Sequence, residues 1–351
     1  MDHCDTLDMA DNPWDERMRF GLFGGARVHR GDHDLARGFR DYVETCVEAE
    51  ALGFESTFLV EHHFSGLGQA SASLDLLAWV AARTSTMRLG TGVIVLPWHD
   101  PVLLAERAAT LDLMSGGRLD FGVGKGYRHS EFAGFCTPYD EAQARFDEAL
   151  QVIITAWTCT DRFSHDGNFW RYKDIVVEPP ALQSPHPPIW IAAGKPDSIR
   201  DVAAYGCKLL LDQFASTEII AERLALFRAE CEAHGRTFDP MDVAVARNLY
   251  VAHDADEAQA AVAQLAAAHA RMVVLSEHPD GRNASHITAY SDTAGATEAN
   301  ALYGTPDRIA AELEGLRAVG VQYVLMYGGE SIKQSIRRFS AEIMPAFIHA
   351  R

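Results

Sequence analysis

Two adjacent histidines, His62 and His63, follow the carboxylate Glu61 at the end of a short uncharged run, residues 57–60. Near neutral pH a histidine can act as a general base or donate a hydrogen bond to a developing anion. The uncharged run suits a buried parallel strand, and α/β sheets gather their chemistry at the carboxyl ends of such strands. We therefore predict that Glu61, His62 and His63 are catalytic or support catalysis. The alternative is that one histidine only packs there.

The histidine pair does not favour a metal site. Adjacent residues of a strand point to opposite faces, so His62 and His63 cannot both face one ion. The sequence also lacks HxH and HExxH motifs. A metal-dependent hydrolase is therefore the disfavoured alternative, and we predict no metal ligand.

Two segments have the composition of an anion-binding site. Residues 122–126 read GVGKG, and such a loop lets backbone amides approach a ligand, although glycines after a strand can also be turn residues only. The loop is neither a Walker motif nor GxGxxG, because position 127 is tyrosine. In the second segment, Gly194 and Lys195 precede Pro196 at the start of a predicted helix, whose free amides could bind phosphate with help from Lys195 or Ser198. Together these segments favour a phosphorylated ligand.

The elements that would position these residues alternate between strands and helices. Strands are expected at residues 18–25, 57–60, 88–96, 118–124, 189–193, 207–214, 243–252 and 321–327. Helices are expected at residues 39–53, 73–84, 102–114, 141–158, 198–205, 217–234, 255–270, 306–319 and 331–347. Eight strands in such an alternation predict a (β/α)8 TIM barrel, an α/β fold; a doubly wound sheet is the alternative.

Two irregular segments interrupt this alternation. Residues 159–188, after the fourth helix, are rich in aromatic residues and proline and predict an insertion with a hairpin across Asp166-Gly167. Residues 271–303, after the seventh helix, are polar and predict a mobile lid. We expect residues 1–17 to be a flexible leader and residues 18–351 to form one domain.

The composition limits the class of partner. The chain has 351 residues, 48% of them hydrophobic, and a formal charge of −18, which argues against nucleic acid and anionic membranes. Its six cysteines form no CxxC pair and suit reduced thiols. With no signal peptide and no apolar run of about 18 residues, the sequence predicts a cytoplasmic protein.

Four segments in fixed order resemble the bacterial luciferase-like flavin monooxygenases, and the luciferase α subunit in particular. They are LVEHHF (59–64), LGTGVIVLP (89–97), DLMSGGRLDFGVG (112–124) and PPIWIAAG (187–194). The resemblance implies a (β/α)8 barrel that binds reduced FMN, supplied by a separate NAD(P)H:flavin reductase, and uses O2. The expected reaction passes through a C4a-peroxyflavin and oxygenates a small, largely apolar substrate such as an aldehyde, ketone or terpene. By family habit, a homodimer would pack around the early helices.

The resemblance also assigns site residues. His62 matches the catalytic histidine, and Glu61 or His63 would orient it. Gly92-Val93 matches a non-proline cis peptide against which the flavin ring packs. The remaining expected cofactor contacts are Gly124, Lys125, Gly126 and Tyr127 in the first anion segment, and Ala193, Gly194, Lys195 and Ser198 in the second.

Gly124 replaces the reactive cysteine of luciferase, so light emission is not implied. We expect Tyr127, Trp98, His99 and the aromatic insertion to line the substrate side. One rival is a deazaflavin-dependent oxidoreductase on the same barrel, which transfers hydride without O2. A second rival is a non-catalytic flavin-binding accessory subunit, against which the retained histidines argue.

Overall fold

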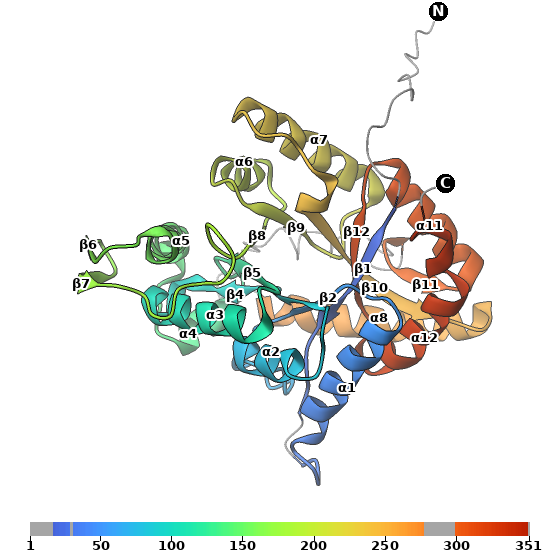
Figure 1. Cartoon of the computed structure of the whole chain (residues 1–351). Coiled ribbons are helices and arrows are strands. Elements are labelled where there is room, and N and C mark those ends of the chain that lie inside the picture. Colours follow the sequence, from blue (N-terminus) through green and yellow to red (C-terminus); the bar gives the residue numbers. More distant parts are fainter. Residues whose placement is uncertain (1–16, 29–30, 277–298, 350–351) are drawn as a thin grey trace, which may run out of the picture.

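Eight parallel strands close into a barrel in the computed structural model, which describes residues 17–28, 31–276 and 299–349 (Figure 1). In order around the barrel they are β1 (Arg19–Gly24), β2 (Ser56–Leu59), β3 (Arg88–Thr91), β5 (Leu119–Gly124), β8 (Ile189–Ala192), β9 (Lys208–Leu211), β10 (Val243–Val251) and β12 (Tyr323–Tyr327). Strand β12 pairs with both β10 and β1, which closes the sheet. The predicted (β/α)8 barrel is confirmed, and the doubly wound sheet is excluded.

Helices surround this barrel, as Figure 1 shows. They are α1 (Arg37–Ala51), α2 (Ser73–Ala81), α3 (Pro101–Ser115), α5 (Ala142–Thr158), α6 (Pro196–Ala204), α7 (Thr217–Ala233), α11 (Pro306–Ala318) and α12 (Ile332–Glu342). Local sequence sets their ends. Asp100 caps α3 by accepting hydrogen bonds from two backbone amides, and Gly116 ends it in the left-handed conformation. Short 3-10 turns cover Leu96–Trp98, Tyr139–Glu141, Pro240–Asp242, Gly329–Ser331 and Met344–Ala346.

Large side chains fill the barrel interior beneath its carboxyl end. Phe58, Trp190 and Tyr323 are buried there, and the Phe58 and Trp190 rings meet edge to face with centroids 5.6 Å apart. Gly90 makes room for this layer, because a Cβ at that position would lie 2.5 Å from the Phe58 ring. The filled interior means that a ligand site can form only above this layer.

The third strand of the barrel is divided. The sequence predicts one strand over 88–96, whereas the structure has β3 and then β4 (Ile94–Val95), separated by a cis peptide between Gly92 and Val93. The cis bond that the family resemblance implies is therefore present. Strand β4 pairs with the end of β5, Val95 opposite Gly124. A Cβ on Gly124 would lie 2.8 Å from the Val93 side chain, so glycine permits this close packing.

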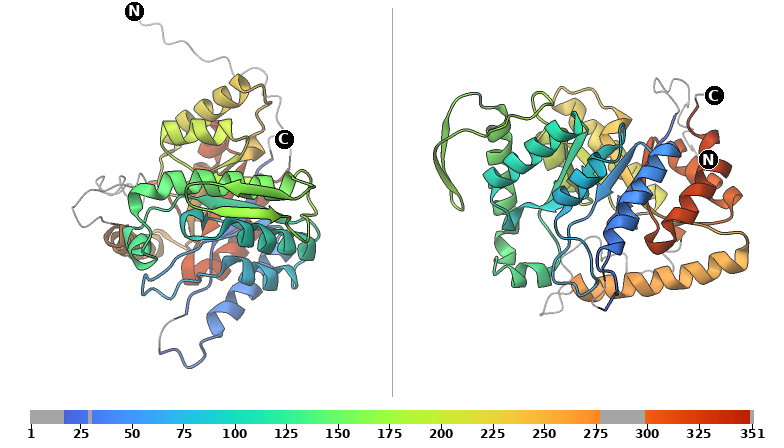
Figure 2. Two further views of the ribbon diagram at one scale, coloured as in Figure 1. Left: turned by 90° about the vertical axis from the view of Figure 1, so that its left-hand side faces the viewer. Right: turned by 60° about the horizontal axis from the view of Figure 1, so that its bottom comes forward.

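The insertion forms the predicted hairpin. Strands β6 (Phe163–Asp166) and β7 (Arg171–Ile175) are antiparallel, and Figure 2 shows them outside α5. The Glu148 carboxylate of α5 accepts hydrogen bonds from the backbone amides of Asn168, Phe169 and Trp170 in the connecting turn. The insertion is thereby fixed to the outer surface of the molecule.

Three other predictions need correction. Helix α8 (Ala255–Ser276) continues past the expected end at residue 270, and β11 (Leu302–Gly304) pairs with β10 inside the segment expected to be irregular. Helix α4 (His129–Gly134) was not predicted, because six residues carry too little periodicity. The last helix ends at Glu342 and not at 347, since Pro345 lacks the amide that a longer helix needs.

Two predictions fall on residues outside the described part of the chain: the leader, for residues 1–16, and the centre of the lid, residues 277–298. Within the described residues, no helix is long and apolar enough to cross a membrane.

Candidate active site

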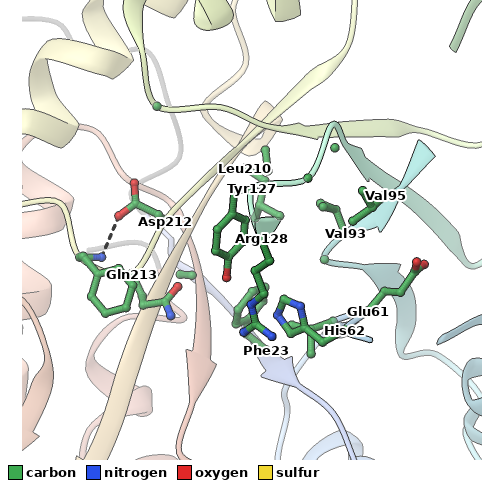
Figure 3. Close-up of a pocket in the computed structure, with 18 of the residues that line it drawn as sticks. Phe23, Glu61, His62, Val93, Val95, Tyr127, Arg128, Leu210, Asp212 and Gln213 are labelled. Atoms are coloured by element: carbon green, nitrogen blue, oxygen red, sulfur yellow. Dashed lines mark hydrogen bonds between the residues drawn. The ribbon is translucent and has the colours of Figure 1, made fainter. Parts of the chain in front are cut away.

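A cavity of about 290 Å³ opens at the carboxyl end of the barrel strands (Figure 3). The loops after the strands form its walls, and α8 contributes Leu265, Ala268 and His269. The predicted site residues that line it are Glu61, His62, Gly92, Val93, Gly124, Lys125, Gly126, Tyr127, Ala193, Gly194, Lys195 and Ser198. Of the residues predicted to be catalytic or to bind the cofactor, His63 alone does not line the cavity.

His62 is oriented by a carboxylate that the sequence did not reveal. Its Nδ1 lies 3.1 Å from Oε1 of Glu131, and the backbone amide of His63 donates to the same oxygen at 2.9 Å. Glu131 belongs to α4 and is only 2% exposed. The expectation that Glu61 or His63 orients His62 is therefore wrong in this respect. The signal in the sequence was a lone carboxylate seven positions after Gly124, in a segment expected to be loop.

This contact fixes how His62 can act. A carboxylate only accepts hydrogen bonds, so Nδ1 carries the proton and Nε2 keeps its lone pair. Burial lowers the pKa of His62 below its usual value and the charge of Arg128 lowers it further, whereas Glu131 raises it. Since burial is the largest cause, the imidazole is neutral near pH 7 and can accept a proton.

Glu61 supports the site from behind. Its Oε1 accepts hydrogen bonds from His63 Nε2 at 2.9 Å, His99 Nε2 at 2.9 Å and Trp98 Nε1 at 3.0 Å. His99 and Trp98 are thus engaged with Glu61 and do not line the cavity, contrary to expectation. Of the residues expected on the substrate side, Tyr127 does line the cavity, and the aromatic insertion does not.

His63 packs among aromatic rings and does not line the cavity. Its ring meets those of Phe135 and Trp98 edge to face, with centroids 4.8 Å and 5.9 Å away. With Nε2 bonded to Glu61 and the backbone amide bonded to Glu131, His63 ties the two carboxylates together. The histidine pair therefore separates into one residue at the cavity and one behind it.

The ionised carboxylate of Glu61 should make the stability of the fold depend on pH in the acid range. Burial opposes its ionisation, but hydrogen bonds from His63 and His99 outweigh burial and lower its pKa to about 2. Relative to an unfolded value near 4.5, this difference contributes on the order of 3 kcal/mol above that pH and is lost as pH falls from 4.5 toward 2. We expect Glu61→Gln to lower the free energy of unfolding at neutral pH and much less at about pH 3. Urea titrations of both proteins measure this, and an equal difference at both pH values would contradict it.

The opposite side of the cavity has the features of an anion site. Lys125, Lys195 and Ser198 line this part of the cavity. Helix α6 begins here at Pro196, and the side chain of its N-cap residue, Lys195, makes no capping hydrogen bond. Burial lowers the pKa of Lys125, and the positive charge of Lys195 lowers it further. Two neighbouring cations beside the free amides of a helix favour a bound anion.

Apolar surface connects this anion site to His62. Phe23, Val93, Val95 and Leu210 line the same cavity as His62 and are labelled with it in Figure 3. At the mouth, His269 of α8 stacks on Phe214 with ring centroids 4.6 Å apart. The cavity can therefore hold a flat, largely apolar group with an anionic end, beside a neutral histidine. In the described residues, no group of three or more His, Cys, Asp or Glu could hold a metal ion.

Residues 18–323 match the family model described as luciferase-like monooxygenase. The chain belongs to this family. A flavin-dependent trigonelline monooxygenase, oxygenase component, of Acinetobacter baylyi is 26% identical, and the match covers 95% of this chain and 97% of that one. The family membership confirms the resemblance noted in the sequence and the enzyme class, an oxidoreductase of the monooxygenase type.

Solved structures of luciferase-like monooxygenases share the fold. The monooxygenase RslO1 from Streptomyces bottropensis has a TM-score of 0.82 and 28% identity over 94% of this chain and all of that one. The oxygenating constituent of 3,6-diketocamphane monooxygenase from Pseudomonas putida, in complex with FMN, has a TM-score of 0.76 and 18% identity over 95% and 99%. F420-dependent enzymes with 17% and 18% identity also share this fold, so the fold by itself does not distinguish FMN from deazaflavin.

Proposed function

We propose that this protein is the oxygenase of a two-component system, which uses reduced FMN and O2 to oxygenate a small organic substrate with a largely apolar body, such as an aldehyde, ketone or terpene. A separate NAD(P)H:flavin reductase would supply the reduced FMN. The observation that carries the proposal is the presence, in one cavity, of a neutral histidine held by a carboxylate and a two-lysine anion site, joined by apolar surface.

The residues of the cavity fit FMN. Lys125, Lys195 and Ser198 with the amides of α6 would hold the phosphate. Gly92 and Val93 would lie against the flavin ring, and Gly124, Gly126, Tyr127, Ala193 and Gly194 would complete its surroundings. Because Gly124 stands where a cysteine would, no thiol takes part at that point.

The protein's own residues supply proton transfer, orientation and exclusion of water. Bound reduced FMN provides the two electrons with which O2 is activated, so that one oxygen enters the substrate and the other leaves as water. Nε2 of His62 would accept or return a proton in the cavity, while Glu131 holds the imidazole ring in place. Helix α8 and the Phe214–His269 stack narrow the mouth and limit entry of water.

Changes to the two lysines of the anion site should weaken the binding of a flavin that carries a phosphate. Replacing Lys195 or Lys125 by glutamine removes a charge-assisted hydrogen bond, and we expect each change to weaken FMN binding about tenfold. Riboflavin, which has no phosphate, is the matched control ligand, and its affinity is expected to stay near that of the wild type. Fluorescence titration with both ligands checks this. An equal loss for FMN and riboflavin would assign the lysines a different role.

Two rival functions, a deazaflavin-dependent oxidoreductase and a non-catalytic accessory subunit, differ from this proposal in the cofactor that binds or in catalytic turnover. Titration of the purified protein with reduced FMN and with reduced deazaflavin is the deciding experiment, followed by O2 uptake with a flavin reductase across aldehydes, ketones and terpenes. We expect tight FMN binding and substrate-dependent O2 uptake. Preference for deazaflavin without O2 uptake would support the oxidoreductase rival. Flavin binding with no turnover for any substrate would support the accessory subunit, which the His62–Glu131 pair disfavours.

A homodimer through the early helices is also proposed. Trp79 of α2 and Leu103 and Met114 of α3 are large apolar residues that the structure leaves 39%, 60% and 63% exposed. Exposed apolar surface of this kind is typical of subunit interfaces. We expect light scattering to give twice the 38.6 kDa mass of the chain, and Met114→Glu with Leu103→Glu to give the monomer. A monomeric wild-type protein would contradict this proposal.

A further inference from the structure

Two arginines reach the cavity in a group separate from the two lysines. Arg128 lies beside His62 and Phe23 in Figure 3, and its charge lowers the pKa of His62. Lys195, in contrast, acts on the pKa of Lys125. The cavity thus has a second positively charged region, next to the proposed catalytic histidine and not at the proposed phosphate site.

Arg128 is buried with its donors only partly used. Arg128 is 3% exposed. Its Nη1 lies 3.3 Å from Oε1 of Gln69 and 3.6 Å from Oε1 of Glu131. Its Nε has no hydrogen-bond partner. A guanidinium carries five N–H donors, and leaving such donors unmatched in a buried position is unfavourable. The unmatched donor therefore indicates an acceptor that arrives with a ligand.

Contacts through Gln69 link Arg128 to residues of three other segments. Arg27, after β1, forms a backbone bridge with Gln69, after β2, and Gln69 in turn accepts from Arg128. The guanidinium of Arg27 donates to the hydroxyl of Tyr327, at the end of β12. All four side chains line the cavity. Two arginines, an amide and a hydroxyl are thus held in place by separate elements of the barrel.

One carboxylate on this side of the cavity contacts Arg128, and the others are bonded elsewhere. Arg27 and Arg128 carry two positive charges, and Glu131 supplies one negative charge. The other acidic residues that line the cavity have partners of their own. Glu61 is bonded to His63, His99 and Trp98, and Asp212 lies 3.0 Å from Arg223. Among the described residues, Glu131 is thus the carboxylate that contacts Arg128, while Arg27 donates to the neutral hydroxyl of Tyr327.

We propose that Arg27 and Arg128 form a subsite for a carboxylate of the substrate, so that the substrate is a small organic acid with an apolar body. This deepens and rests on the proposed function, because it names the substrate class of the same site. The planar guanidinium matches a carboxylate with two parallel hydrogen bonds, and a carboxylate would give the unmatched Nε of Arg128 an acceptor. Gln69 and Tyr327 fix the two arginines, which sets where the acid group lies relative to His62.

The test compares benzoate with benzamide, which has nearly the same shape and no charge, by calorimetric titration of the FMN-loaded protein. We expect benzoate to bind at least about tenfold more tightly than benzamide. Arg128→Gln and Arg27→Gln should each remove most of this preference, whereas Arg37→Gln, on the exposed face of α1, should keep it. Arg27 is exposed, so its variant decides the matter if Arg128→Gln does not fold. Equal affinities in the wild type, or a preference that survives both variants, would overturn the subsite.

A second comparison separates this subsite from the phosphate site. Lys195→Gln should weaken FMN binding and keep the preference for benzoate over benzamide. Arg128→Gln should keep FMN binding and lose that preference. If Lys195→Gln loses the preference for benzoate over benzamide, benzoate binds at the phosphate site. If Arg128→Gln loses affinity for FMN and keeps that preference, Arg128 contacts the cofactor. Either result overturns the proposal. If the wild type does not bind FMN, the proposed function fails, and benzoate titrated with excess phosphate present still tests the subsite.

Discussion

Replacing His62 by alanine is expected to lower the rate of substrate oxygenation by about 10²- to 10⁴-fold, the range typical of a lost general base. Its Nε2 is the nitrogen of a neutral imidazole that faces away from the Glu131 contact, and among the described residues no other histidine ring contacts Glu131. The lysines of the anion site are unchanged in this variant, so FMN affinity should stay near the wild-type value. Product formation and fluorescence titration with FMN measure the two effects separately.

His234→Ala is the matched control, because this exposed histidine lies at the end of α7, outside the cavity. It should retain full activity. Normal turnover in His62→Ala would remove His62 from the mechanism, and a parallel loss of FMN affinity would show that its role is in binding.

Glu131→Gln is expected to have the second largest effect, a loss of activity on the order of 10²-fold, as small misplacements of a reacting group can produce. The carboxylate holds Nδ1 of His62 and the amide of His63, so glutamine removes a charge and loosens both contacts. Glu131 acts through His62 and is therefore a positioning residue. Activity alone would not distinguish this role from a structural one.

The pH profile makes that distinction. Burial sets the pKa of His62 below its usual value, and the Glu131 carboxylate raises it, so removing that charge lowers the pKa further. The acid limb of kcat/KM should therefore move to lower pH in Glu131→Gln, whereas Glu222→Gln, on the exposed surface of α7, should leave it unchanged. An acid limb that stays in place would show that Glu131 has only a structural role.

The barrel could be predicted because its strands and helices are long enough to carry periodicity. Short elements could not: α4 has six residues and β11 has three, and their positions depend on packing. Helix α8 runs past its predicted end because nothing in residues 271–276 stops a helix, although their composition suggested a lid. The hairpin was predictable, since the turn sequence Asp166-Gly167 stands between two short segments that contain aromatic residues.

The site residues that follow barrel strands could be predicted from the sequence. The hydrogen-bond partners of their side chains could not. His62 and the lysines follow strands, so the barrel fold brings them to one cavity. The partner of His62 lies 69 residues away in the sequence, on a helix that was not predicted. Local sequence likewise could not show that Trp98 and His99 turn toward Glu61, because this depends on the 3-10 turn that follows β4.

The central claim is that O2 provides the oxygen atom that this protein adds to its substrate. The most direct measurement supplies the protein with FMN, a flavin reductase, NAD(P)H and ¹⁸O2, and determines the mass of the product by mass spectrometry. We expect one labelled oxygen in each product molecule, with the second oxygen atom of O2 in water. An oxidised product without label, formed equally well in the absence of O2, would contradict it.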